Sequence, residues 1–195
     1  MNLHPEALLE EFRRAQALLE GHFCLSSGLH SRGYLQCALI LQHPEEAARL
    51  GAALAAKAKA LRPAAVLSPA LGGVIIGHEV GRAMGVRAIF AERSPSSSSA
   101  LTLRRGFALE PGERVLVVED VVTTGGSTRE TIDVARKMNA EVVGAVAIVD
   151  RSDGAMSLDV PFHALLKLSL PTYEPSACPL CAQRLAVTKP GSRSA

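Results

Sequence analysis

The stretch from Val115 to Thr128, Val-Leu-Val-Val-Glu-Asp-Val-Val-Thr-Thr-Gly-Gly-Ser-Thr, decides the fold of this chain. Four apolar residues are followed directly by two acids and then by a small, hydroxyl-rich loop. The pattern predicts a buried strand over Val115–Val118 and a helix over Ser127–Met138. Gly125 and Gly126 let the loop fold tightly and bring backbone N–H groups up to an anion, which the helix dipole also favours. The stretch therefore predicts a phosphate cradle at a helix N-terminus.

Acidic and hydroxyl side chains border this predicted cradle. Glu119 and Asp120 follow the apolar run, where they could hold ribose hydroxyls or face a metal-bound ligand. The hydroxyl donors come from Thr123, Thr124, Ser127 and Thr128. A phosphate pocket beside an acid pair suits a sugar phosphate better than free phosphate. The alternative is an ordinary strand–loop–helix unit that carries two acids at the end of its strand.

Strand and helix patterns alternate along much of the chain. The predicted helices cover Pro5–Glu20, Pro44–Leu61 and Gly72–Ala83, and the further strands cover Ala64–Ser68, Val86–Ala91 and Glu141–Val149. Ser94–Ala100 is predicted to be a loop, and Thr102–Leu109 to be extended. This alternation predicts an α/β fold with a doubly wound, mainly parallel sheet flanked by helices. Its ligand site should lie beyond the carboxyl ends of the strands.

Composition narrows the class of protein. A length of 195 residues predicts one domain, and 48% hydrophobic residues can build a full core. The net charge of +2 and the absence of a basic tract argue against nucleic-acid binding. No apolar run reaches membrane-spanning length, so a cytoplasmic location is expected. No Gly-x-x-x-x-Gly-Lys-Ser/Thr motif is present, which argues against a nucleoside-triphosphate P-loop. No spaced Gly-x-Gly-x-x-Gly motif follows a strand, which argues against a dinucleotide-binding fold.

The stretch from Val115 to Thr128 resembles the signature of type I phosphoribosyltransferases, which bind phosphoribosyl pyrophosphate (PRPP). A second loop, Ser68-Pro-Ala-Leu-Gly-Gly73, resembles the pyrophosphate loop of that family. The implied PRPP contacts come from the first loop together with Ala70, Leu71, Gly72 and Gly73. The resemblance also implies a cis peptide bond between Ala70 and Leu71. Many family members have a lysine in this loop, where this chain has Gly72.

The segment Gly21–Gln36 resembles the N-terminal base-binding segment of orotate phosphoribosyltransferases. The resemblance implies orotate contacts from Ser26, Tyr34, Leu35 and Thr123, with Ser26 standing where a lysine is frequent. It also implies that Arg151, at the end of the strand Glu141–Val149, pairs with the orotate carboxylate. A guanidinium binds a carboxylate through two parallel hydrogen bonds, and neutral bases lack that group.

The Ser-rich region departs from the family pattern. The family usually carries a mobile loop here with a catalytic lysine, but no lysine lies between Arg93 and Gly112. We therefore predict that Arg93, Arg104 or Arg105 neutralises the pyrophosphate, and that Arg93 is the best positioned of the three. Asp120 is the fourth predicted catalytic residue.

The resemblance as a whole implies the transfer of the phosphoribosyl group of PRPP to orotate in pyrimidine synthesis. It implies one phosphoribosyltransferase domain over residues 1–195, with a core over 44–151 and a hood built from 1–43, either alone or together with 152–195. It further implies a magnesium ion that needs no dedicated protein ligands, and a homodimer. A purine-base phosphoribosyltransferase, a PRPP-sensing regulator and a catalytically inactive relative are the alternatives.

Cysteine spacing gives one more signal. Cys178-Pro-Leu-Cys181 has the spacing of half a zinc knuckle or of a redox motif, but no second close pair is present. His163 and Cys24 could complete a site only through the tertiary fold. We therefore assign no metal ligands and expect a turn with two thiols or a local disulfide. His30 is a candidate substrate contact, and the other histidines, including His22, are expected at the surface or in local structural roles.

Overall fold

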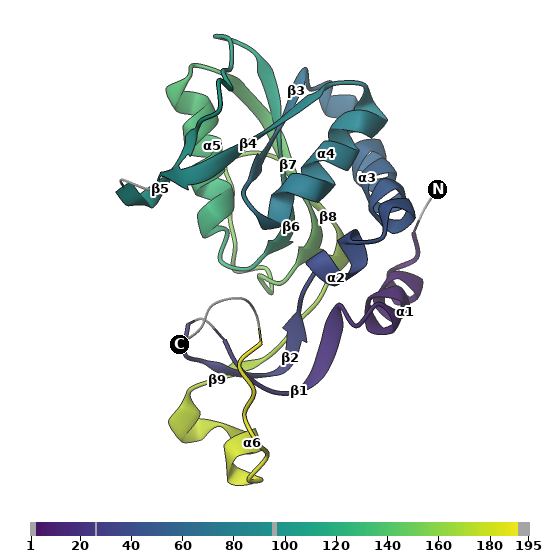
Figure 1. The fold of residues 1–195 in the computed structure, drawn as a ribbon, viewed down its shortest axis with the longest axis vertical. Coiled ribbons are helices and arrows are strands. Elements are labelled where there is room, and N and C mark those ends of the chain that lie inside the picture. The colour runs from purple at the N-terminus through teal and green to yellow at the C-terminus, as the bar shows by residue number, and fades with distance from the viewer. Residues whose placement is uncertain (1–2, 26, 95–96, 191–195) are drawn as a thin grey trace.

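The structure is a computed structural model and describes residues 3–25, 27–94 and 97–190. Six of its strands form a central sheet: β3 (Ala65–Pro69), β4 (Arg87–Ser94), β5 (Ser97–Leu103), β6 (Arg114–Val122), β7 (Glu141–Asp150) and β8 (Phe162–Lys167). Their order is β5-β4-β3-β6-β7-β8 (Figure 1). All neighbours pair in parallel except β5, which is antiparallel to β4. The prediction of a doubly wound, mainly parallel sheet is confirmed.

Helices cover both faces of this sheet (Figure 1). On one face lie α3 (Pro44–Ala58), which continues into the 3-10 turn η1 (Lys59–Leu61), and α4 (Gly72–Met84). On the other face lies α5 (Gly126–Lys137). Each strand alternates its side chains between the two faces, so that both helical layers find an apolar surface.

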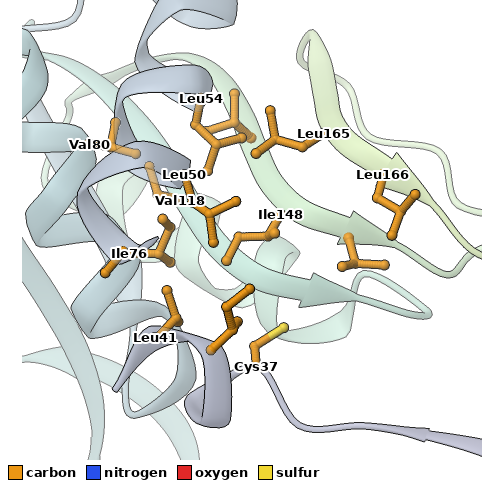
Figure 2. Close-up of a cluster of buried hydrophobic side chains, with 14 of the residues drawn as sticks. Cys37, Leu41, Leu50, Leu54, Ile76, Val80, Val118, Ile148, Leu165 and Leu166 are labelled. Carbon is orange, nitrogen blue, oxygen red and sulfur yellow. The ribbon is translucent and has the colours of Figure 1, made fainter. Parts of the chain in front are cut away.

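The largest apolar core lies under α3 and α4. Leu50 and Leu54 of α3 and Ile76 of α4 pack against Val118 of β6 and Ile148 of β7 (Figure 2). All five side chains are fully buried. The same cluster takes in side chains from α1 (Pro5–Arg14) and from the short helix α2 (Ala38–Leu41). The carboxyl ends of β3, β6 and β7 are thereby fixed beside one another.

A second, small sheet stands apart from the central one and combines β1 (Leu18–Cys24), β2 (His30–Leu35) and β9 (Thr172–Tyr173) in antiparallel pairs. The 3-10 turn η2 (Pro175–Ala177) and helix α6 (Pro179–Ala182) follow β9 (Figure 1). Further along the tail, Thr188 bridges to Phe23 of β1. This small sheet contains parts of both segments assigned to the hood, whereas β8 joins the central sheet. Within the described ranges, none of the helices has the length and apolar character that crossing a membrane requires.

The first predicted helix, Pro5–Glu20, is too long. Helix α1 ends at Arg14, and Leu18 already belongs to β1. Gln16 adopts a left-handed φ of 54°, and the N–H of Ala17 bonds to the carbonyl of Phe12 at 2.8 Å. These are the features of a Schellman motif. The helix therefore ends at a glutamine in the conformation that glycine usually provides, and not at Gly21.

The predicted loop Ser94–Ala100 is also wrong in part. Residues 95–96 lie outside the described ranges, but β5 begins at Ser97 and pairs with β4 as far as Leu103. The strand is fixed by Leu101, which is 6% exposed and packs into the core under α5. The predicted extended run over Thr102–Leu109 stops early, because Arg105 and Gly106 turn the chain with φ values of 58° and 77°.

Candidate active site

The predicted phosphate loop lies between β6 and α5. Strand β6 continues to Val122, so the two acids belong to the strand rather than following it. Gly125 has a left-handed φ of 75°, and a Cβ atom there would lie 2.9 Å from the side chain of Met156. Helix α5 begins at Gly126, and Thr123 and Thr124 precede its N-cap residue Gly125. The N–H groups of its first turn have no partner within the helix, so this loop suits a phosphate.

Glu119 is buried beneath this loop. Its carboxylate accepts hydrogen bonds from the hydroxyls of Ser127 and Thr128, one at each oxygen. Burial raises the pKa of Glu119, while these two hydrogen bonds act in the opposite direction. Glu119 therefore holds the start of α5 against β6, and both of its oxygens already have partners.

Asp120 faces the second predicted loop across a small cavity. The cavity has a volume of about 170 Å³, and its walls include Ala70, Gly72, Gly73 and Asp120. A Cβ atom at position 72 would lie 2.7 Å from Oδ1 of Asp120, so no longer side chain fits there unless the acid moves. Burial raises the pKa of Asp120. This close approach gives a physical reason for glycine where many family members have lysine.

The predicted cis peptide bond between Ala70 and Leu71 is confirmed. The N–H of Ala70 bonds to the carbonyl of Ala91 at 2.8 Å, which ties this loop to β4. The side chain of Leu71 points outward and is 86% exposed. The loop from Ser68 to Gly73 therefore offers mainly backbone groups to the cavity.

The three candidate arginines lie in different surroundings. Arg93 lines the cavity beside Asp120, and its guanidinium lies 3.2 Å from the carboxylate of Glu130. Arg105 binds Glu92 through two hydrogen bonds of 2.8 and 3.0 Å, and Arg104 lies 3.6 Å from the same acid. The structure thus brings Arg93 to the cavity and places Arg104 and Arg105 around Glu92.

A larger cavity of about 650 Å³ lies on the other side of the phosphate loop. Tyr34, Thr123 and Arg151 line it, as the sequence predicts for a base-binding pocket, and so does Thr124, which was predicted as a PRPP contact. Leu35 does not line it, because its side chain belongs to the main apolar core. Ser26 lies outside the described residues. The remaining walls come from residues that the sequence analysis did not select, Leu25, Ser27, Leu29, Ser152, Asp153, Ala155, Met156, Leu170, Pro171 and Thr172.

Arg151 and Ser152 both line this cavity and carry a buried polar atom without a hydrogen-bond partner among the described residues. Of the two, Arg151 is the charged residue. It follows β7 directly, and its backbone N–H bonds to the carbonyl of Val122 at 2.8 Å. Its Nε is buried and has no hydrogen-bond partner among the described residues. Burial lowers the pKa of Arg151 below its ordinary value. A half-buried guanidinium whose Nε is buried without a partner costs free energy until an anion binds it, so the cavity is suited to a ligand with a carboxylate.

Comparison with known proteins agrees with this geometry. Residues 38–172, more than half of the chain, match the phosphoribosyl transferase domain. This chain belongs to the phosphoribosyltransferase family. An orotate phosphoribosyltransferase of Caldanaerobacter subterraneus subsp. tengcongensis is 49% identical, over 98% of this chain and 99% of its own length. The orotate phosphoribosyltransferase of Novosphingobium aromaticivorans is 55% identical, over 97% of both chains.

Solved phosphoribosyltransferase structures share the fold. An orotate phosphoribosyltransferase from Aeropyrum pernix aligns with a TM-score of 0.71 and 27% identity, over 83% of this chain and 93% of that one. The Mycobacterium tuberculosis H37Rv enzyme, in complex with PRPP, aligns with a TM-score of 0.58 and 24% identity, over 69% and 81%. The second likeness shows the fold alone. Both agree with a central parallel sheet flanked by helices.

Proposed function

We propose that this protein transfers the phosphoribosyl group of PRPP to orotate, giving orotidine 5′-monophosphate and pyrophosphate in pyrimidine biosynthesis. The observation that carries the proposal is the buried, unpartnered Nε of Arg151 in a cavity bordered by the phosphate loop. Orotate is the pyrimidine base with a carboxylate to match that guanidinium. The relatives named above support the same reaction, since they align over nearly the whole chain.

In this proposal, the two cavities and the phosphate loop between them bind PRPP and the base. The phosphate loop, from Thr123 to Thr128, holds the 5′-phosphate through backbone N–H groups and hydroxyls at the start of α5. The backbone of Ala70 to Gly73 faces the pyrophosphate in the smaller cavity. Tyr34 and Arg151 hold orotate in the larger one. Since Thr123 and Thr124 line the larger cavity and Ser127 the smaller, the ribose lies along this loop between the two reacting groups.

Asp120 is the residue best placed to hold a magnesium ion. Its carboxylate oxygens face the smaller cavity, where the missing side chain of Gly72 leaves them open. Carboxylate oxygen is a hard donor of the kind that magnesium prefers, and one or two such ligands suffice when phosphates supply the rest. When bound, magnesium supplies positive charge to neutralise the pyrophosphate. Asp120 also lies where it can accept hydrogen bonds from the ribose hydroxyls.

Catalysis rests on positioning and charge rather than on a nucleophilic side chain. The bond from the anomeric carbon to pyrophosphate breaks and a bond to the orotate ring nitrogen forms, through a transition state that resembles an oxocarbenium ion. Arg93 lines the pyrophosphate cavity and neutralises the charge that develops on the leaving group. Holding both reactants in one geometry removes much of the entropic cost of their encounter.

The active form is a homodimer in this proposal. Leu71 and Ile75 are 86% and 45% exposed, and they lie four positions apart at the start of α4. Exposed apolar side chains beside a site fit a surface that a second copy covers. Light scattering should give the mass of two chains. An Ile75→Asp variant should shift the mass toward one chain, whereas Arg82→Ala, further along the same helix, should not.

A cytoplasmic location fits the cysteines. All four are free thiols in the structure. Free thiols persist in reducing compartments, whereas secreted proteins usually oxidise theirs. Fractionation of cells that produce the protein should place it with cytoplasmic markers, and its appearance in the culture medium would contradict this location.

Orotate consumption tests the reaction directly. The ultraviolet absorbance of orotate is followed with PRPP and magnesium present, and again with each omitted in turn. We expect loss of orotate only when both are present. Uracil, adenine, guanine and hypoxanthine are then offered in place of orotate. Turnover of a purine without turnover of orotate would contradict the proposal and indicate a purine-base enzyme. Binding of PRPP without turnover of any base would favour a regulator.

A further inference from the structure

Four potential metal ligands gather at the outer edge of the small sheet. His22 comes from β1 and His30 from β2, whereas Cys178 and Cys181 come from the segment that forms α6. One ligand atom from each residue lies within 4.8 Å of all the others. Neither His163 nor Cys24, which the sequence suggested as partners for the two thiols, belongs to this cluster. The tertiary fold thus supplies the second ligand pair that the sequence lacks.

The spacing of these atoms matches a tetrahedral metal site. Bonds of about 2.3 Å to sulfur and about 2.0 Å to nitrogen, at tetrahedral angles, place sulfur and nitrogen ligands about 3.5 Å apart. The Sγ atoms of Cys178 and Cys181 lie 3.6 and 3.7 Å from Nε2 of His22. Sγ of Cys181 lies 3.3 Å from Nδ1 of His30. The two ring nitrogens are 2.8 Å apart and would separate by about 0.5 Å around a metal.

His22 is already oriented as metal-binding histidines usually are. Its Nδ1 lies 2.9 Å from the carbonyl oxygen of Leu185. A carbonyl can only accept a hydrogen bond, so Nδ1 carries the proton and the lone pair of Nε2 faces the cluster. A backbone carbonyl on the far nitrogen is the common second partner of a histidine that binds zinc.

Burial and charge also suit a divalent metal. His22, His30 and Cys178 are 5%, 9% and 3% exposed, and Cys181 lies at the open edge of the cluster. Two thiolates balance the two positive charges of the ion, and neutral imidazoles add none. The bound site would therefore carry no net charge, which makes its burial tolerable. No disulfide joins the two cysteines in the structure, so both sulfurs are available as ligands.

We propose that His22, His30, Cys178 and Cys181 bind one zinc ion in a structural site. Tetrahedral coordination by two sulfurs and two nitrogens is the arrangement that zinc favours, and four protein ligands leave no open position for a substrate. The ion would fasten the tail to β1 and β2, where Thr188 already exchanges backbone hydrogen bonds of 2.8 and 2.9 Å with β1.

This site lies outside both active-site cavities but shares strands with one of them. His30 pairs with Tyr173 in the small sheet, and the neighbouring pair joins Ser31 to Thr172, which lines the larger cavity. Tyr34, on the same strand as His30, lines that cavity too. Zinc would therefore hold the outer wall of the base pocket in place without touching the substrates, and this role does not depend on which base is bound.

Metal analysis of the purified full-length protein tests the proposal. The protein is produced without a polyhistidine tag, purified without chelators, and its zinc content is measured by plasma mass spectrometry. We expect about one zinc ion per chain. The double variant Cys178→Ser/Cys181→Ser should lose it. Cys24→Ser is the matched control and should keep its zinc, because the Cys24 thiol lies outside the cluster and contacts the carbonyl of Leu25.

Cobalt replacement gives a second readout that does not require the variants to fold. Zinc is removed from the native protein with a chelator, and cobalt(II) is added. We expect sulfur-to-cobalt charge transfer together with the visible bands of tetrahedral cobalt. A natively folded protein with neither zinc nor these bands would overturn the proposal. So would an intact mass two hydrogens lighter in freshly purified protein, with peptide mapping that joins Cys178 to Cys181, since a disulfide leaves no thiolates for a metal.

Discussion

Strand β6 of the central sheet buries Val115 to Val118 without interruption, whereas β2 of the small sheet buries His30 and Ser31 along with Gly33 and Leu35. The central sheet is covered by helices on both faces, so every side chain of this β6 run meets apolar neighbours. In the described structure, the small sheet joins the main core through Leu18 and Leu35, and its interior also includes imidazole rings and thiols. Apolar burial can stabilise the first region alone, but the second needs specific polar or metal contacts.

The largest expected effect comes from breaking the core of the central sheet. Ile148 of β7 is fully buried and packs with side chains of the helices α3 and α4 (Figure 2). We expect Ile148→Ala to lower the free energy of unfolding by about 2–5 kcal/mol, because it removes buried methyl groups and leaves a cavity. Urea denaturation measures this change. The control is Met138→Ala, at a position that is 39% exposed, which should change stability by no more than about 0.5 kcal/mol. Equal losses from the two variants would contradict this account of the core.

A second substitution should separate activity from stability. Arg151 lies at the end of β7, yet its Nε has no partner in the described structure. We expect Arg151→Ala to lower kcat/KM for orotate about 10- to 150-fold, the loss of one or two hydrogen bonds to a charged group. The free energy of unfolding should fall little, because the Nε of Arg151 has no hydrogen-bond partner among the described residues to lose. Steady-state kinetics and urea denaturation on the same samples test both parts. Arg82→Ala, on the exposed side of α4, is the control and should keep wild-type kinetics.

Hydrogen exchange should show the difference between the sheets directly. We expect backbone amides of β1 and β2 to exchange at least about 10-fold faster than those of β6 and β7, because less apolar surface covers them. If zinc binds the tail to the small sheet, a chelator should speed exchange in β1 and β2 and leave the exchange rates of β6 and β7 unchanged. Mass spectrometry of peptides from both sheets measures the rates. Equal protection in the two sheets would mean that the small sheet is stabilised as strongly as the central one.

The smallest expected effect is on the pH dependence of stability. It concerns Glu119 and Glu113, whose pKa values are shifted in opposite directions. Burial raises the pKa of Glu119 under the phosphate loop. Between the ordinary glutamate pKa of about 4.3 and this raised value, the folded chain holds a proton that the unfolded chain has lost. Stability therefore falls as pH rises through that window, and Glu119→Gln should flatten this fall.

Glu113 provides the contrast. Hydrogen bonds from Arg87 lower the pKa of Glu113, so its contribution is present above the ordinary glutamate pKa and is lost as pH falls through the lowered value. Glu113→Gln should therefore reduce stability at neutral pH and have little effect in strong acid. Urea denaturation from pH 3 to pH 8 compares the variants, and identical pH profiles for both would refute the assignment.

Local signals predicted the parts of the site that lie near one another in sequence. The apolar run before Glu119 and the glycines of the phosphate loop gave the strand, the loop and the helix, because each depends on backbone chemistry within a few residues. The role of Arg151 was implied by the resemblance to orotate phosphoribosyltransferases, and the structure puts it in the same cavity as Tyr34 and Thr123. The continuation of β6 to Val122 was missed because acids at positions 119 and 120 look like the end of a buried strand.

Contacts between distant parts of the chain could not be predicted. His22 and Cys178 are 156 positions apart, and no pattern within β1 indicates that its histidine meets thiols from the tail. The glutamine that ends α1 was missed for a different reason, since only its backbone conformation marks the helix end. The walls of the larger cavity near Met156 and Leu170 follow from the path of an irregular segment, for which periodicity gives no signal.

The bridge between Phe23 and Thr188 has a consequence for synthesis on the ribosome. Every strand of the central sheet has been translated once residue 167 is added, so this sheet can fold while later residues are still being made. The small sheet cannot be completed until β9 and the segment around Thr188 have emerged. A nascent chain can thus become compact well before it can close the wall of the larger cavity. If this cavity holds the base as proposed, a product truncated near residue 170 should fold in its larger part yet bind orotate poorly.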